Sequence, residues 1–296
     1  MTSAGLEGRW LEHLPPERLF ALDGRVAIVT GAAGGLGRWL AAGIAAAGAS
    51  VLLTDRVEPE LVQQASAFEQ RGWRVAALVE DLEVEDAPVR IVDAARQRFQ
   101  RVDVLVNNAG INQRLPMLEV PRDVLEHVWR VDYLRQYELA QVAARAMIEY
   151  GHGGSIIHIS SLNNAVGLED ISLLGPTKAA LSQLAKGMAI ELAHHRIRVN
   201  AIAPGFMDTP MNAGHWDDPT RAPWILDRVP MARPGHPAEL VGTCLLLASD
   251  AGSYMTGQTL YVDGGFTAGS RWNIPPGAGL EAYRTHGGYG HPLSAE

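Results

Sequence analysis

Short apolar runs alternate with longer amphipathic stretches along the chain from Arg25 onward. The runs are rich in β-branched residues, which predicts strands at 25–30, 50–54, 73–79, 102–107, 154–160, 197–203 and 258–264. The first six are largely apolar on both faces, as buried parallel strands are. The stretches between the strands have the length and periodicity of helices, near 36–47, 58–71, 85–99, 121–150, 172–195 and 237–249.

This alternation predicts an α/β fold, a single doubly wound parallel sheet of about seven strands with helices on both faces. Right-handed crossovers give the strand order 3-2-1-4-5-6-7. One domain is expected over 21–265, preceded by an N-terminal arm at 1–20. The Gly- and Pro-rich segment 266–296 is interpreted as an irregular C-terminal tail. It either ends freely or lies over a neighbouring subunit, anchored by Trp272, Tyr283 and Tyr289.

Composition and charge narrow the class of protein. The chain has 296 residues, 47% hydrophobic and 20% charged, as in ordinary globular proteins. Its net charge of −8 disfavours nucleic acid or an anionic membrane as a partner. Cys244 is the only cysteine, and no run approaches the roughly 20 apolar residues of a membrane span. We therefore expect a cytoplasmic protein without an intrachain disulfide, acting on a small molecule.

A glycine-rich loop, VTGAAGGLGR, follows the first strand and leads into the first helix. Gly31 permits a tight turn, Gly35 lets backbone amides approach a diphosphate, and Gly37 allows close packing of helix on strand. The helix N-terminus adds oriented N–H groups and the positive end of the helix dipole. A glycine trio placed between strand and helix is typical of a Rossmann-type dinucleotide site.

The end of the second strand bears on the choice of cofactor. Asp55 stands about 20 residues beyond the loop, where a carboxylate accepts hydrogen bonds from the adenosine ribose and repels a 2′-phosphate. Arg56 follows directly, and a guanidinium binds phosphate well. The sequence therefore favours NAD(H) and leaves NADP(H) open.

With further motifs, these residues make the chain resemble the short-chain dehydrogenase/reductase family over residues 20–265. The loop matches its TGxxxGxG pattern, and NNAG and NAIAPGFMDTPM match two other segments. Within the family, INQRLPMLEV and the segment VPMARPGHPAELVGTCLLLASDAGSYMTGQTLYVDGG look most like sugar-acid and polyol dehydrogenases of the gluconate 5-dehydrogenase type. The resemblance implies hydride transfer and assigns cofactor binding to Thr30, Gly31, Gly35, Leu36, Gly37, Asp55, Asp81, Leu82, Asn108, Ala109, Gly110, Lys178, Pro204, Gly205, Met207 and Thr209.

Two positions depart from the family's catalytic set of Asn, Ser, Tyr and Lys. Ser161 and Lys178 match that set, but the tyrosine position holds Leu174 and the asparagine position holds Asp132. In the family the tyrosine exchanges a proton with the substrate, and leucine has no ionisable group. Losing such a group typically costs about 10²–10⁴ in rate. The resemblance implies that Lys178 also binds the nicotinamide ribose, a role that Leu174 leaves intact.

Three functions remain open at this point. In the first, the enzyme moves hydride between nicotinamide and a small C=O or C=N substrate, and Asp132 replaces the tyrosine. Asp170 and Glu169 are further candidates for that proton, whereas His158, inside the fifth strand, is interpreted as a core residue. A protonated C=N bond needs no proton in the transition state, and a carboxylate stabilises its cation. The second function is a non-redox NAD-dependent lyase or epimerase. The third is NAD binding without catalysis, including through an engineered loss of the tyrosine.

Two segments are expected to select the substrate. They are the loop after Ser161, LNNAVGLEDIS, and a lid at about 206–228 that contains Trp216 and Trp224. The sequence has no HExxH, paired CxxC or EF-hand pattern, so no metal site is predicted. Family members commonly pack through the Lys178 helix and the last helix and strand, which implies a homodimer or homotetramer.

Overall fold

Seven parallel strands form one sheet in the order β3-β2-β1-β4-β5-β6-β7, which confirms the predicted fold and strand order. The computed structural model describes residue 11 and residues 14–269. Most of the predicted N-terminal arm and nearly all of the predicted tail, including Trp272, Tyr283 and Tyr289, lie outside the described residues. The strands are β1 (Val26–Thr30), β2 (Ser50–Asp55), β3 (Val75–Val79), β4 (Val104–Asn107), β5 (Gly154–Ile159), β6 (Ile197–Pro204) and β7 (Thr259–Val262).

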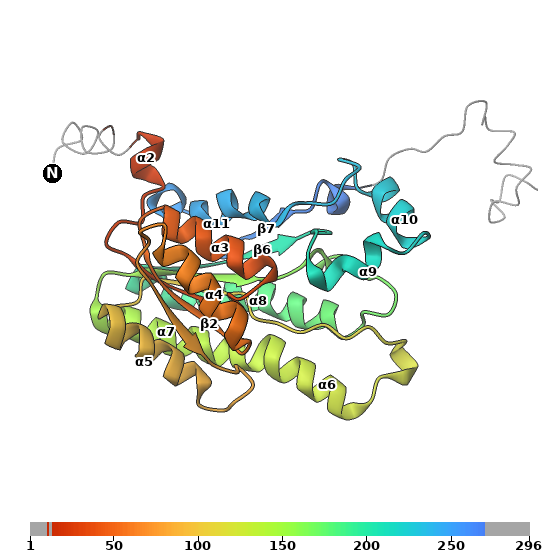
Figure 1. The fold of residues 1–296 in the computed structure, drawn as a ribbon, viewed down its shortest axis with the longest axis horizontal. Helices are drawn as coiled ribbons and strands as arrows, with labels where there is room; N and C mark the ends of the chain where they lie inside the picture. The colour runs from red at the N-terminus through yellow and green to blue at the C-terminus, as the bar shows by residue number, and fades with distance from the viewer. Residues whose placement is uncertain (1–10, 12–13, 270–296) are drawn as a thin grey trace, which may run out of the picture.

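Helices cover both faces of the sheet, and Figure 1 shows α3 and α11 above it and α5 and α7 below it. One core joins the sheet to α3, α4 and α11, and a second core joins it to α5, α7 and α8. Cys244 is buried in α11, and burial raises the pKa of its thiol to about 12. The α-helices are α2 (Pro16–Leu19), α3 (Gly35–Ala46), α4 (Glu58–Glu69), α5 (Ala87–Phe99), α6 (Arg122–Trp129), α7 (Arg135–Tyr150), α8 (Leu174–Leu192), α9 (Ala213–Trp216), α10 (Arg221–Arg228) and α11 (Val241–Ala248).

The prediction that the first six strands are buried on both faces is wrong for β3. This strand lies at the edge of the sheet and pairs only with β2. Its buried and exposed positions alternate, and Val79 is 44% exposed. The apolar run 73–79 therefore reflects one covered face rather than two.

The predicted helix at 121–150 is interrupted. A π-helical turn, η2 (Arg130–Leu134), separates α6 from α7. Such turns shift which side chains face inward and are frequent at functional sites. Asp132 lies in this turn with a fully buried side chain, and Gln136, four residues later, is also fully buried.

The helix predicted at 172–195 begins at Leu174. Pro176 is its third residue, and proline is tolerated in a first helical turn because the N–H groups there have no intrahelical partner. This start places Leu174 and Lys178 one turn apart on α8, on the same side of the helix.

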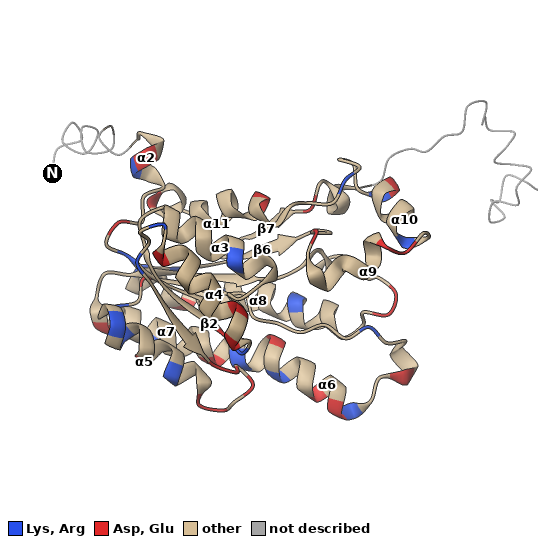
Figure 2. Ribbon diagram, viewed as in Figure 1, with Lys and Arg blue, Asp and Glu red and all other residues tan. Residues whose placement is uncertain are grey.

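Figure 2 shows Lys and Arg interspersed with Asp and Glu over the helices and loops, while the strands are mostly uncharged. Among the described residues, no helix is both long and apolar enough to cross a membrane.

Candidate active site

A cavity of about 890 Å³ opens at the carboxyl ends of the strands, where parallel α/β sheets bind their ligands. The loops after β1, β4, β5 and β6 all contribute to its wall. Most of the predicted site residues line it: Gly31, Gly35, Leu36, Asp55, Asn108, Ala109, Gly110, Asp132, Ser161, Leu174, Lys178, Pro204, Gly205, Met207 and Thr209.

Four predicted cofactor residues do not line this cavity. Thr30 lies behind the wall, where its hydroxyl oxygen accepts hydrogen bonds from the N–H groups of Asn108 and Ala109, both at 2.9 Å. Gly37 packs so tightly on the loop that a Cβ there would stand 2.0 Å from the Gly31 carbonyl oxygen. Leu82 is buried in the core, and Asp81 lines a smaller neighbouring pocket.

The glycine loop leaves an open surface at the start of α3. Gly31 and Gly35 have positive φ angles of 65° and 50°, in the left-handed region that favours glycine. A Cβ at Gly34 or Gly35 would meet nothing within 4 Å, and both residues line the cavity. The first N–H groups of α3 have no intrahelical partner. These residues therefore fit a diphosphate.

Asp55 is held in place at the far end of this loop. Its Oδ2 accepts a hydrogen bond from Ala33 N at 3.0 Å, and its Oδ1 accepts one from Val57 N at 3.1 Å. Arg56 points to another carboxylate, with its Nη1 3.9 Å from Asp81 Oδ2. Glu60, from the first turn of α4, also lines the cavity. Two carboxylates, Asp55 and Glu60, therefore line this end of the cavity.

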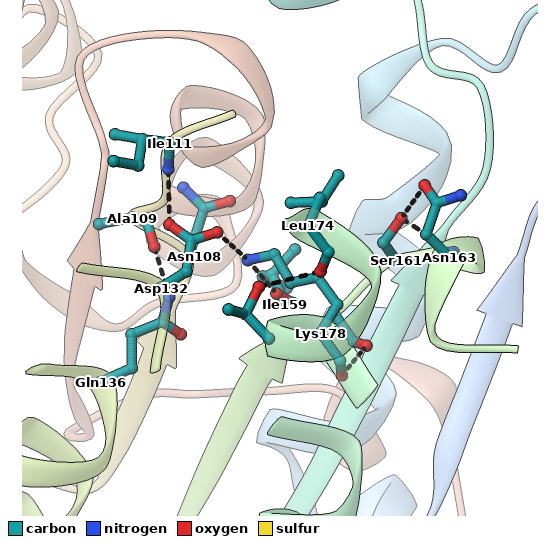
Figure 3. A network of polar contacts seen from close by, with 12 residues as sticks. Asn108, Ala109, Ile111, Asp132, Gln136, Ile159, Ser161, Asn163, Leu174 and Lys178 are labelled. Carbon is teal, nitrogen blue, oxygen red and sulfur yellow. Dashed lines mark hydrogen bonds and ion pairs between the residues drawn. The ribbon is translucent and has the colours of Figure 1, made fainter. Parts of the chain in front are cut away.

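Lys178 and Asp132 form a buried ion pair at the floor of the cavity. Lys178 Nζ lies 3.5 Å from Asp132 Oδ2 and donates a hydrogen bond to the Ile159 carbonyl oxygen at 3.3 Å (Figure 3). The side chains are 8% and 0% exposed. Gly110 packs against the pair, since a Cβ there would stand 3.2 Å from Nζ and 3.3 Å from Asp132 Oδ1.

Asp132 and Gln136 also fix the backbone that follows β4. Asp132 Oδ1 accepts a hydrogen bond from Ile111 N at 2.7 Å, and Gln136 Nε2 donates one to the Ala109 carbonyl oxygen at 2.6 Å. Asp132 Oδ2 has no hydrogen-bond partner. Burial raises the pKa of Asp132, and the Lys178 charge opposes that rise. Asp132 is therefore a desolvated carboxylate beside a cation.

Ser161 and Leu174 complete the wall on the other side of Lys178. The Ser161 hydroxyl donates to Asn163 Oδ1 at 3.1 Å and accepts from Asn163 N at 3.2 Å. Figure 3 shows Leu174 between this pair of residues and the Lys178–Asp132 pair. Leucine carries no proton to exchange. Of the predicted catalytic residues, only Asp132 and Lys178 are ionisable.

His158 is a core residue, as predicted. Its side chain is fully buried, neither ring nitrogen has a hydrogen-bond partner, and it pairs in the sheet with Asn107. Burial, followed by the Lys178 charge, lowers the pKa of His158 to about 4. The ring is therefore neutral at physiological pH.

Each of the two segments predicted to select the substrate contributes some of its residues to the cavity wall. Asn163 and Trp224 line it, with Glu169 and Asp170 from the loop after Ser161. Trp216, by contrast, does not line it. The predicted lid contains the short helices η5 (Pro210–Asn212), α9 and α10.

Sequence reasoning missed three residues of this region. Arg114 and His215 line the cavity, and Gln136 supports its wall. The position of Arg114, four residues after the NNAG motif, was a usable signal because that motif lies on the cavity wall. Gln136 had a weaker signal, being one helical turn after Asp132. Within residues 14–269, no three His, Cys, Asp or Glu side chains gather in a way that could hold a metal ion.

Comparisons with known proteins agree with this geometry. Residues 31–267 match the family model described as Enoyl-(Acyl carrier protein) reductase. The chain is 38% identical over 250 residues to 2-dehydro-3-deoxy-D-gluconate 5-dehydrogenase of Escherichia coli (strain K12), covering 84% of this chain and 98% of that one. It is 38% identical over 247 residues to L-xylulose reductase of Bos taurus, covering 83% and 98%.

A solved structure extends the similarity to three dimensions. The gluconate 5-dehydrogenase of Burkholderia cenocepacia J2315, in complex with NADP and tartrate, has a TM-score of 0.82 and 36% identity, covering 86% of this chain and 100% of that one. The resemblance seen in the sequence is thereby confirmed, and the chain belongs to the short-chain dehydrogenase/reductase family of NAD(P)-dependent oxidoreductases.

Proposed function

We propose that this protein transfers hydride between a nicotinamide dinucleotide and a small C=O or C=N substrate, with the Lys178–Asp132 pair in place of the family's tyrosine. The observation that carries the proposal is this buried pair, whose nitrogen and oxygen lie 3.5 Å apart on the cavity wall beside Leu174. The relatives reported above are named dehydrogenases or reductases, so the lyase or epimerase alternative has no support.

For a carbonyl substrate, the chain must supply one proton to the alkoxide that hydride addition forms. Lys178, one helical turn from Leu174 on α8, is proposed to give that proton from its ammonium group, and the resulting neutral amine then takes a proton from solvent. The paired Asp132 carboxylate favours the return of the ammonium form. Ser161 is proposed to donate a hydrogen bond to the substrate oxygen. Lys178 and Ser161, which are proposed for these two roles, line the same cavity.

For a C=N substrate, the protein needs only to stabilise the positively charged, protonated iminium form of the substrate. Hydride addition to a protonated iminium gives a neutral amine, so no proton is required in that step. A desolvated carboxylate stabilises positive charge more strongly than one in water. Asp132, fully buried and lacking a hydrogen-bond partner for Oδ2, has this property.

When bound, the nicotinamide ring supplies or accepts the hydride. The residues proposed to bind the dinucleotide are those of the glycine loop, Asp55, the 108–110 segment and the 204–209 segment. The cofactor proposed is NAD(H), because Asp55 is fixed by two N–H groups and Arg56 faces Asp81. NADP(H) remains an alternative, since a similar structure contains NADP.

The domain limits and the assembly also belong to this proposal. Residues 21–265 form the dinucleotide-binding domain, and 206–228 form its lid. Large apolar side chains are exposed on α8 at Ile190 and on β7 at Tyr261. Such side chains favour a homodimer or homotetramer packed through these elements, which the molar mass in solution would test.

The test of the function is a substrate screen with both reduced cofactors. Sugar acids, polyols, ketones and cyclic imines would be assayed by the change in nicotinamide absorbance. Turnover of any C=O or C=N compound, lost in Lys178→Ala, is expected. If the purified protein binds NADH but turns over none of these classes, the hydride-transfer proposal is wrong.

A further inference from the structure

The hydroxyl group of Ser161 already uses its hydrogen within the protein. Ser161 Oγ donates a hydrogen bond to Asn163 Oδ1 at 3.1 Å and accepts one from Asn163 N at 3.2 Å. Within residues 14–269, Asn163 is the only partner of this hydroxyl. A hydroxyl has one hydrogen and two lone pairs, so one lone pair is left. Because Ser161 lines the cavity, this lone pair is what its hydroxyl offers to a ligand.

The orientation of the Asn163 amide sets the direction of this hydrogen bond. Asn163 Nδ2 donates a hydrogen bond to the Val166 carbonyl oxygen at 3.2 Å. A carbonyl oxygen only accepts, so the amide nitrogen faces Val166 and the amide oxygen faces Ser161. Turning the amide over would place two acceptor oxygens against each other at Val166. Ser161 is therefore the donor to Asn163, and Asn163 Oδ1 is the acceptor.

The turn that carries these residues is held against α8. Ser161 is the N-cap of the 3₁₀ turn η3 (Leu162–Asn164). Asn164 Nδ2 donates a hydrogen bond to Ser160 Oγ at 3.0 Å, and Ser160 Oγ donates one to the Lys178 carbonyl oxygen at 2.9 Å. These bonds fix the turn relative to the backbone of Lys178. The lone pair of Ser161 is thus presented to the cavity from a held position.

We infer that Ser161 accepts a hydrogen bond from the substrate, and that the substrate is a protonated imine with an N–H on its reacting C=N bond. The inference rests on the proposed function, because it selects one of the two substrate classes given there. A carbonyl oxygen only accepts, so it would face the lone pair of Ser161 without a hydrogen between them. Ser161 would have to give up its bond to Asn163 before it could donate to such an oxygen.

The same difference persists through the reaction. Adding hydride to the carbon of a protonated C=N bond turns the π electron pair into a nitrogen lone pair, and the nicotinamide that gives the hydride is oxidised. The N–H bond is kept, so Ser161 accepts from it before and after the step. In a ketone the oxygen gains negative charge, which requires donors rather than a lone pair. The arrangement of Ser161 and Asn163 therefore suits the imine throughout.

The experiment compares three six-membered rings that differ at one ring position. Piperidinium has N–H donors, N,N-dimethylpiperidinium has the same charge without an N–H, and cyclohexanone only accepts. Binding is measured by titration calorimetry, with and without cofactor. NADH accompanies the two cations and NAD⁺ the ketone, so that no turnover takes place. The two cations separate the effect of the N–H from the effect of charge.

Ser161→Ala removes the acceptor. It should weaken piperidinium binding by about 3–10-fold, as for loss of one hydrogen bond, and should leave N,N-dimethylpiperidinium unchanged. Ser172→Ala is the matched control, because Ser172 is exposed in the same loop and lies outside the cavity wall. An equal loss for both cations, no loss for piperidinium, or undetectable piperidinium binding overturns the inference.

Asn163→Leu tests the inference in the opposite direction. It removes the amide oxygen and frees the Ser161 hydrogen, so cyclohexanone should bind about 3–10-fold more tightly. Unchanged cyclohexanone affinity in a folded Asn163→Leu protein overturns the inference, and if this variant does not fold, Ser161→Ala decides. Turnover of ketones but not of cyclic imines in the substrate screen would also overturn it and leave hydride transfer standing. The expected binding pattern without NADH binding or any turnover would count against the proposed function alone.

Discussion

Lys178 Nζ and Asp132 Oδ2 lie 3.5 Å apart with both side chains almost fully buried. Lys178 comes from α8 and Asp132 from the π-helical turn between α6 and α7, so the pair joins two elements across the cavity floor. Removing either partner would leave the other charge buried and unmatched, which is costly. The effect of each substitution on cofactor affinity should therefore be measured separately from its effect on turnover.

Asp132→Asn removes a charge with little change of shape. If Asp132 stabilises a substrate cation, reduction of a cyclic imine should slow by about 10–100-fold, whereas ketone reduction should not slow. In the unmodified protein the imine rate should fall as pH drops through the raised pKa of Asp132, because the charged form is lost. Steady-state rates against pH check this, with NADH affinity as the control. Unchanged rates and pH profiles would make Asp132 structural.

Lys178→Ala should act first on cofactor binding. The ammonium lies on the cavity wall whichever side chain occupies position 174, and in the family this lysine binds the nicotinamide ribose. We expect NADH affinity to fall by about 10–100-fold, as for one or two charge-assisted hydrogen bonds. Lys186→Ala, on the exposed side of the same helix, is the control. Fluorescence titration that shows equal affinity for both variants would refute this role.

Leu174→Tyr distinguishes carbonyl from imine chemistry. A tyrosine at this position would stand one helical turn from Lys178 and add a proton donor to the wall. Because the Lys178–Asp132 pair is proposed to replace the tyrosine, turnover of ketones or alcohols should change little, and a rise of about 10²–10⁴ would mean instead that the protein is an alcohol dehydrogenase disabled by Leu174. Imine turnover should not rise, since that step needs no proton. Both rates are measured with NADH on the same preparations. Unchanged carbonyl turnover would show that Lys178 and Asp132 already supply the proton.

The sequence predicted the sheet order because each strand is a continuous apolar run and each crossover has one hand. It also placed Gly31, Asp132, Leu174 and Lys178 around one cavity, since loops after parallel strands meet at one edge. The prediction from sequence was wrong where the hydrophobic periodicity carries no information. The extra residue of a π-helical turn does not change the hydrophobic pattern in a recognisable way. An edge strand can have the same continuous apolar sequence as an inner strand.

Arg114 and His215 show a second limit of prediction from sequence. They lie 101 positions apart and meet only because the loops after β4 and β6 converge. Arg114 follows the NNAG motif closely, but no spacing in the sequence links it to His215. Contacts between loops depend on tertiary packing, which a single sequence does not reveal.

Cofactor preference depends on Asp55. Its carboxylate is held by the N–H groups of Ala33 and Val57, so it cannot easily turn away from a 2′-phosphate. We expect NADH to bind at least about tenfold more tightly than NADPH, and Asp55→Asn to reduce that ratio. Fluorescence titration of both cofactors checks this. Equal or tighter NADPH binding to the unmodified protein would mean that Arg56 dominates.

The buried His158 should make stability depend on pH. Its pKa is lowered to about 4 in the folded protein, against ~6.5 in the unfolded chain. A lowered pKa gives stability that is fully present above pH ~6.5 and is lost as pH falls through the folded value, because unfolding then takes up a proton. The loss from this one ring is on the order of 3 kcal/mol.

His158→Gln removes the titrating group, so the stability of this variant should fall less between about pH 6.5 and 4 than that of the unmodified protein. His215, with a pKa also lowered to about 4, contributes equally to both proteins, so the difference between them isolates His158. Urea unfolding at several pH values measures it, with His152→Gln, at an exposed position, as the control. Parallel pH curves for the unmodified protein and His158→Gln would mean that the buried ring is not obliged to stay neutral. In that case its neighbours, Lys178 included, would have to be arranged differently from the structure described above.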